Sequence, residues 1–182
     1  MLKEKDILDE KVKLLRKKSQ LVTFPLSKDD KKLIKDATEY LRKSQDEEYA
    51  KEHNIRGGMG LAFVQLGVLK RIFVISYKHD DGNFEEYVVI NPKIISHSEE
   101  LIYVEEGEGC LSVNRDVEGI VPRYARVTVE YKDIDGKTIE TRAREEISVA
   151  FQHEIDHLDG ILFVDKIDKK NPFNNEENMR PI

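Results

Sequence analysis

The chain has 182 residues, of which 36% are charged and 39% are hydrophobic, and its formal net charge is -6 at pH 7. This length and balance are typical of one soluble domain that is large enough to bury a core. The acidic net charge argues against a general nucleic-acid binder, and no apolar run predicts a membrane span. Residues 1–6 lack the apolar core of a signal peptide, and the single cysteine cannot form an internal disulfide. We therefore expect a cytoplasmic protein.

Residues 1–20 are rich in Lys and Glu, and a basic run of this kind is typical of a solvated face. A long first helix is expected after Ser27, which is a good N-cap and is followed by two aspartates that oppose the positive end of the helix dipole. Apolar residues continue at helical spacing to Leu41. We expect this helix to end before Gly57-Gly58 and to serve packing rather than chemistry.

Short apolar or alternating runs follow the glycines, and Gly, Asp, Asn and Pro separate them, which predicts strands. The runs cover residues 61–66, 71–77, 86–90 and 101–104. Asp81-Gly82 and Asp135-Gly136 each lie between two strand-like runs and are hairpin candidates. Residues 127–131 and 138–141, on either side of the second candidate, alternate well enough to pair.

Gly58 and Gly60 could belong to a dinucleotide-binding fingerprint, but a helix precedes them and residues 61–64 have an extended pattern, which disfavours phosphate binding. We expect these glycines to let the backbone approach a ligand closely. Gln65 ends the expected strand, and at this position its side chain could be a solvent-facing amide.

Residues 151–160 contain the pattern His-Glu-x-x-His. Apolar residues at the spacing of a buried helical stripe surround it, at Ile147, Phe151, Ile155 and Leu158. Residues four apart on a helix face the same way, so His153 and His157 can bind one metal ion. Glu154 is rotated by about 100° and lies beside the metal, where it can take a proton from water. The alternative is a core helix whose histidines only satisfy hydrogen bonds.

Two histidines leave a catalytic metal short of a protein ligand. The only cysteine, Cys110, lies in a glycine-broken acidic turn that precedes a short apolar run. A thiolate at this position would complete a Cys-His-His site and leave a fourth position open for water. An isolated cysteine is also often a small buried hydrophobe, so both interpretations stay open at this point.

Three motifs together resemble the signature motifs of peptide deformylases, in the family's order. They are Gly-Met-Gly-Leu-Ala-Phe-Val-Gln at 58–65, Glu-Gly-Cys-Leu-Ser at 108–112, and Gln-His-Glu-Ile-Asp-His-Leu at 152–158. The match extends from about residue 20 to about residue 168, and the long N-terminal segment resembles the second bacterial subclass. The first motif departs from the usual Gly-x-Gly-x-Ala-Ala-Pro-Gln, because Phe63 replaces the second Ala and Val64 replaces the Pro.

The resemblance implies a metal-dependent hydrolase that removes the formyl group from the N-terminal formyl-methionine of newly made polypeptides and releases formate. The implied metal ligands are Cys110, His153 and His157, the implied general base is Glu154, and the implied oxyanion donors are the side-chain amide of Gln65 and the backbone N–H of Leu111. One divalent metal ion is expected, Fe²⁺ in the cell, with Zn²⁺, Ni²⁺ and Co²⁺ also accepted. The expected partners are N-formyl-Met peptides and nascent chains, with a transient ribosome contact left open and with no specific nucleic acid or membrane.

The expected architecture is α+β, with antiparallel strands around a central metal-binding helix and a long N-terminal helix. We expect a single catalytic domain over residues 1–168 and a polar, linker-like tail over residues 169–182. If residues 61–66 form a strand, Phe63 shares a face with Gln65, because successive side chains on a strand point to opposite faces. Phe63 is then expected to alter recognition of the peptide beyond formyl-Met.

Two other functions compete with deformylation. A zinc endopeptidase shares His-Glu-x-x-His but needs a third His or a Glu ligand downstream, where only Glu176 and Glu177 follow. A metal-bound domain without turnover would have no use for Glu154.

Overall fold

The computed structural model describes residues 2–182 and contains two sheets. The larger sheet has five strands in the order β1-β2-β3-β6-β7, and all neighbours pair antiparallel. Its strands are β1 (Gly60–Ala62), β2 (Ile72–Lys78), β3 (Phe84–His97), β6 (Arg126–Lys132) and β7 (Thr138–Arg144). The smaller sheet has the order β5-β4-β8, with β5 (Arg123–Tyr124), β4 (Leu101–Tyr103) and β8 (Arg180–Pro181).

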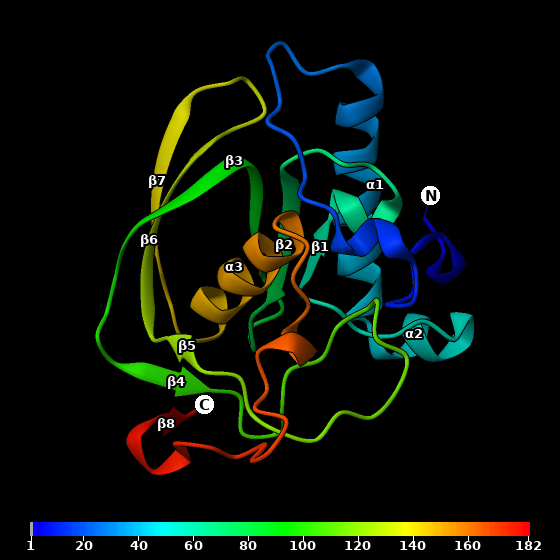
Figure 1. Ribbon diagram of the computed structural model, residues 1–182. Coiled ribbons are helices and arrows are strands. Elements are labelled where there is room, and N and C mark those ends of the chain that lie inside the picture. Colours follow the sequence, from blue (N-terminus) through cyan, green and yellow to red (C-terminus); the bar gives the residue numbers. More distant parts are fainter. Residues whose placement is uncertain (1) are drawn as a thin grey trace.

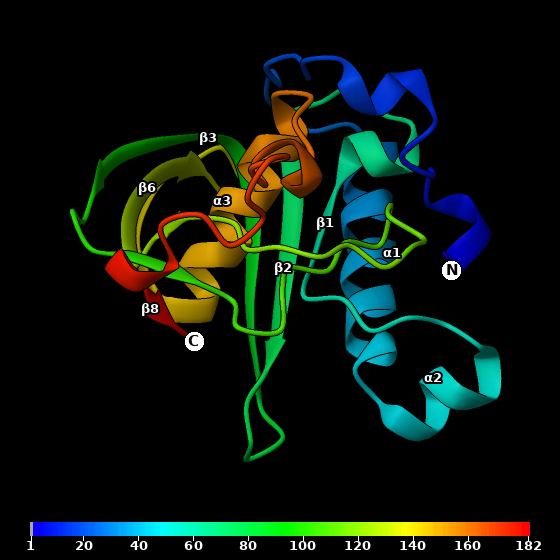
Figure 2. The same cartoon turned by 60° about the horizontal axis from the view of Figure 1, so that its bottom comes forward.

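The helix α3 (Glu145–Leu158) lies at the centre of the molecule, and the strands curve around it (Figure 1). Figure 2 shows α3 on one side of β2 and the helix α1 (Lys28–Ser44) on the other. The expectation of an α+β fold with antiparallel strands around a central helix is therefore confirmed.

The strand β2 joins the two halves of the core because it is buried on both faces. Ile72 and Val74 point toward α1, whereas Phe73 and Ile75 point toward α3, as the two-residue period of a strand requires. Phe73 meets Phe151 of α3 edge to face, with ring centroids 5.7 Å apart. This packing fixes the position of α3 against the sheet.

The expected first helix is in fact two helices. α1 begins after Ser27, whose side chain accepts a hydrogen bond from the Asp30 N–H, as expected for an N-cap. It ends at Ser44, and a short helix α2 (Glu47–His53) follows, with Asp46 as its N-cap. The Gln45 amide between the helices donates to the carbonyls of Gly58 and Ser76, so contacts with distant residues set this break.

Both expected hairpins are confirmed. β2 and β3 pair across the turn at Asp81-Gly82, and β6 and β7 pair across the turn at Asp135-Gly136. Gly82 and Gly136 each have φ of 84°, a conformation that glycine adopts at little cost.

The expected strand over residues 61–66 is wrong beyond Ala62. Residues Phe63–Leu66 form a 3₁₀ helix, and the Gln65 side chain folds back so that its Oε1 accepts a hydrogen bond from the Ala62 N–H at 2.8 Å. Phe63 and Gln65 therefore do not share a strand face.

The N-terminal segment, residues 2–20, forms backbone hydrogen bonds with all three motifs. Its basic side chains are exposed, as expected, but Leu15 is fully buried in the core beneath α3. Its backbone N–H groups donate to one carbonyl in each motif: Leu8 to Gln65 at 2.8 Å, Glu10 to Ser112 at 2.7 Å and Ser19 to Leu158 at 2.8 Å. The segment therefore ties the three motifs together.

The expected tail, residues 169–182, is mostly exposed, as a polar tail would be, but its last residues contact the rest of the chain. β8 pairs in parallel with β4, Met179 is buried, and Arg180 forms ion pairs with Glu100 and Glu145. Within residues 2–182, the structure contains no helix that is both long and apolar enough to span a membrane.

Candidate active site

Three side chains with metal-binding atoms meet at the centre of the molecule. His153 and His157 come from α3, and Cys110 comes from the loop between β4 and β5. One ligand atom from each lies within 4.8 Å of the other two, and Cys110 Sγ is 3.3 Å from His157 Nε2. A thiolate and two imidazoles at this spacing suit a first-row divalent metal with one open position.

A buried oxygen atom beside this cluster supports the binding of a metal. Among residues 2–182, Glu154 Oε2 has no hydrogen-bond partner. Leaving a buried carboxylate oxygen unpaired is costly, and a metal ion with its water would supply the missing partner of Glu154. The residues that are present therefore fit a metal centre.

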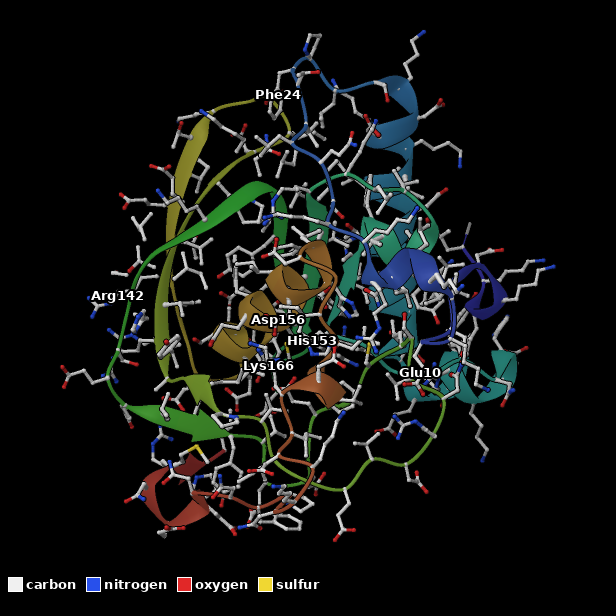
Figure 3. All side chains as sticks on the ribbon, in the orientation of Figure 1. Glu10, Phe24, Arg142, His153, Asp156 and Lys166 are labelled. Carbon is white, nitrogen blue, oxygen red and sulfur yellow. The ribbon has the colours of Figure 1, made fainter. Side chains whose placement is uncertain are left out.

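The orientation of His153 is set by a buried ion-pair network that the sequence reasoning missed. Its Nδ1 lies 2.9 Å from Glu108 Oε2, which leaves Nε2 to face the metal position. Arg123 Nε pairs with Glu108 Oε1 at 2.6 Å, and Arg123 Nη1 pairs with Asp156 Oδ2 at 2.6 Å. Lys166 extends the network, because its Nζ lies 3.2 Å from Asp156 Oδ1 (Figure 3 labels both residues).

The charges of this network are strongly stabilised. Burial alone would raise the pKa of Glu108, but hydrogen bonds with Arg123 and His153 outweigh it and hold that pKa at about 2. Glu108 therefore stays ionised. Glu108 opens the second motif, so its proximity to the ligands could have been suspected, whereas no motif indicates Arg123.

Burial favours the uncharged forms of Glu154 and His157, so it shifts their pKa values in opposite directions. Burial raises the pKa of Glu154 to about 7, a value suited to a group that accepts and returns a proton at neutral pH. Burial also holds the pKa of His157 well below its usual value, and the nearby His153 adds to this effect. A neutral His157 is the form that binds a metal.

The two expected oxyanion donors lie beside Cys110. Gln65 Nε2 donates to Ser112 Oγ at 3.0 Å and lies 3.7 Å from Cys110 Sγ, and its Oε1 is fixed by the Ala62 N–H. The backbone N–H of Leu111 has no acceptor among residues 2–182. The structure therefore brings every sequence-predicted site residue to one place.

The glycines of the first motif make room for the other two motifs. A Cβ on Gly58 would lie 2.7 Å from Leu111 Cδ1, and a Cβ on Gly60 would lie 2.3 Å from Glu154 Oε1. The expected close approach is therefore made partly to side chains of the protein itself, and Gly60 leaves the space that Glu154 occupies.

We expect Gly60→Ala to lower kcat on the order of 10²-fold while metal content stays unchanged, because the added methyl group displaces Glu154. Steady-state kinetics of metal-loaded protein provide the measurement. In a Glu154→Gln background the same substitution should cost little more, because both changes disable one group. Additive losses would show that Gly60 acts elsewhere.

A cavity of about 450 Å³ opens beside the ligand cluster. Its lining includes the polar side chains of Gln65, Cys110, His153 and Glu154. It also includes apolar residues, namely Met59, Val104, Leu111, Val149 and Ala150. A cavity that combines an apolar surface with a few polar groups suits a short aliphatic side chain attached to a polar reacting group.

Phe63 and Val64, the two departures from the family's first motif, do not line this cavity. Both are fully buried, Phe63 in the core toward α1 and Val64 in the core toward α3. The expectation that Phe63 alters peptide recognition is therefore not supported by its position, because the 3₁₀ helix turns its side chain into the core.

Phe63→Ala should instead lower the free energy of unfolding by about 3 to 5 kcal/mol, because it leaves a cavity in the packed core. Urea unfolding followed by circular dichroism measures this loss, and KM for formyl-Met peptides should change less than twofold. A large change in KM at unchanged stability would instead show that Phe63 affects recognition of the peptide.

Comparisons with known proteins agree on one family. The model of the polypeptide deformylase family matches residues 4–173. A peptide deformylase of Oceanobacillus iheyensis is 46% identical over 182 residues, which are 100% of each chain. The crystal structure of a probable peptide deformylase from Synechococcus phage S-SSM7 superposes with a TM-score of 0.71 at 34% identity, over 88% of this chain and 97% of that one. A class I type b peptide deformylase from Acinetobacter baumannii, bound to Met-Ala-Ser, gives a TM-score of 0.70 at 30% identity, over 88% and 96%. The chain therefore belongs to the polypeptide deformylase family.

Proposed function

We propose that Cys110, His153 and His157 hold one divalent metal ion and that Glu154 is the general base of the deformylase reaction. Enzymes of this family remove the formyl group from the formyl-methionine at the start of new polypeptides, and this chain carries that activity. The observation that carries the residue assignment is the convergence of the three ligand atoms within 4.8 Å beside the unpaired carboxylate oxygen of Glu154.

The metal, when bound, lowers the pKa of a water molecule and polarises the formyl carbonyl. Glu154 takes a proton from the attacking water and passes it to the leaving nitrogen of the methionine. Gln65 Nε2 and the Leu111 N–H donate hydrogen bonds to the formyl oxygen as it gains negative charge. Glu108 keeps His153 oriented during the reaction, because the ion pair with Arg123 keeps Glu108 ionised and in place.

The apolar wall of the cavity is proposed to bind the methionine side chain. Val104, Val149 and Ala150 offer an apolar surface beside the ligand cluster, where an unbranched thioether fits. The relative from Acinetobacter baumannii was crystallised with Met-Ala-Ser, a peptide that begins with methionine as a deformylated product does. The small formyl group is proposed to lie between the ligands and Gln65.

Fe²⁺ is proposed as the metal in the cell, in the cytoplasm where nascent chains are made, because the resemblance to the family implies iron. A mixed thiolate and imidazole set is compatible with Fe²⁺ and with other first-row metals. Protein purified without oxygen should contain about one iron per chain and should release formate from a formyl-Met-Ala-Ser peptide. The same peptide with an acetyl group in place of formyl serves as control and should be cleaved far more slowly. Absence of formate release from metal-loaded protein would contradict the proposed function.

A zinc endopeptidase is not favoured by the arrangement of ligands. The only cluster of three His, Cys, Asp or Glu side chains with metal-binding spacing among residues 2–182 includes Cys110. Glu176, one of the two downstream candidates, instead accepts a hydrogen bond from the Tyr103 hydroxyl in the smaller sheet. The third ligand therefore comes from the second motif.

A further inference from the structure

Arg56 binds backbone carbonyls of the loop that carries Cys110 and Leu111. It lies just before the first motif, and its guanidinium donates to the carbonyls of three loop residues. Nη1 donates to Cys110 O at 3.4 Å and to Val113 O at 2.9 Å, and Nη2 donates to Leu111 O. An arginine that satisfies several backbone carbonyls of one loop restricts the conformations of that loop.

The remaining contacts of Arg56 fix the guanidinium itself. Nε donates to Glu4 Oε1 at 2.9 Å, and the Arg56 backbone N–H donates to Glu4 Oε2 at 3.2 Å. Glu4 belongs to the N-terminal segment, so the ion pair joins this segment to the loop. Four of the five guanidinium N–H groups are thus directed at groups within the chain.

The contact with Cys110 O bears directly on the reaction. The Cys110 carbonyl and the Leu111 N–H belong to one planar peptide group and point in opposite directions. A charged donor on the carbonyl therefore fixes the direction of the N–H and polarises it toward a stronger hydrogen bond. The same loop positions Cys110 Sγ.

We infer that Arg56 is a positioning residue that aims the Leu111 N–H at the formyl oxygen. The inference rests on the proposed function, because it needs the Leu111 N–H to act as an oxyanion donor. Direct recognition of the peptide by Arg56 is the competing role, since its side chain is 39% exposed and lines the cavity. Its inward hydrogen bonds favour positioning.

The test compares Arg56→Lys and Arg56→Ala with Arg115→Met. Lysine keeps the charge but cannot reach several carbonyls in a fixed plane. Arg115 lies on the same loop and also pairs with an acid of the N-terminal segment, because its Nε is 2.7 Å from Glu10 Oε1, but it donates to none of the loop carbonyls (Figure 3 labels Glu10). The substitution Arg115→Met therefore removes an arginine from the loop and leaves the Cys110–Leu111 peptide group unchanged.

In metal-loaded protein, both Arg56 variants should lose kcat by roughly ten- to a hundredfold per bound metal, with KM within about twofold of the parent. Millimolar ethylguanidinium should restore part of the kcat of Arg56→Ala but should not affect Arg56→Lys. Arg115→Met should behave as the parent does. If KM rises while kcat holds, if kcat per bound metal is unchanged, or if ethylguanidinium restores nothing, the positioning role is overturned.

A second readout does not depend on turnover. In zinc-loaded protein with ¹⁵N-labelled leucine, the Leu111 amide resonance should move in Arg56→Lys and stay in place in Arg115→Met. An unmoved resonance in Arg56→Lys would overturn the inference even if the enzyme is active. Failure of the parent protein to release formate would instead count against the proposed function, whatever the amide resonance shows.

Discussion

Metal-loaded Glu154→Gln should keep its metal and should hydrolyse formyl-Met peptides about 10² to 10⁴ times more slowly than the parent. Glutamine has nearly the same size and can still form hydrogen bonds, but it cannot accept the proton that the attacking water must lose. Glu154 lies outside the ligand set and its Oε2 has no partner within the described residues, so its replacement leaves the three ligands in place.

Formate release and metal analysis on the same preparation measure turnover and metal content separately. Glu130→Gln removes one negative charge from an exposed position on β6 and should leave both unchanged. Near-normal turnover by metal-loaded Glu154→Gln would rule out the proposed base.

Cys110→Ala should abolish activity and lower the metal content of purified protein well below one ion per chain. The loss is expected because the thiolate is the third of the three proposed ligands, and two imidazoles from one helix bind a metal weakly. Cys110→Ser, which keeps the size of the side chain, should show the same loss.

Cobalt substitution gives an independent measurement. The parent protein with Co²⁺ should show a sulfur-to-metal charge-transfer band, and the band should be absent in Cys110→Ser. Since Cys110 is the only cysteine of the chain, the band has one possible thiolate source. An active cobalt form without this band would exclude the thiolate as a ligand.

Local sequence patterns were sufficient for the features whose determinants are close together in the chain. The spacing of His153 and His157 predicted that both side chains lie on one face of α3, and the Asp-Gly pairs predicted both hairpins. The resemblance of the three motifs then supplied Cys110 and Gln65, which lie far from α3 in the sequence.

Other features were missed because distant residues determine them. The 3₁₀ helix after Ala62 is held partly by the bond from the Leu8 N–H to the Gln65 carbonyl. Likewise, the charge of Arg123 can be buried only because Glu108 and Asp156 form ion pairs with it in the folded chain. No local periodicity contains such information.

The backbone bonds of the N-terminal segment also determine when the active site can be completed. The Ser19 N–H donates to the carbonyl of Leu158 at the end of α3, so this bond cannot form before Leu158 has been synthesised. Pairs so far apart along the chain close large loops, and such contacts form late and slowly in folding. An enzyme that acts on nascent chains therefore cannot assemble its own site until α3 has been synthesised and has folded against the N-terminal segment.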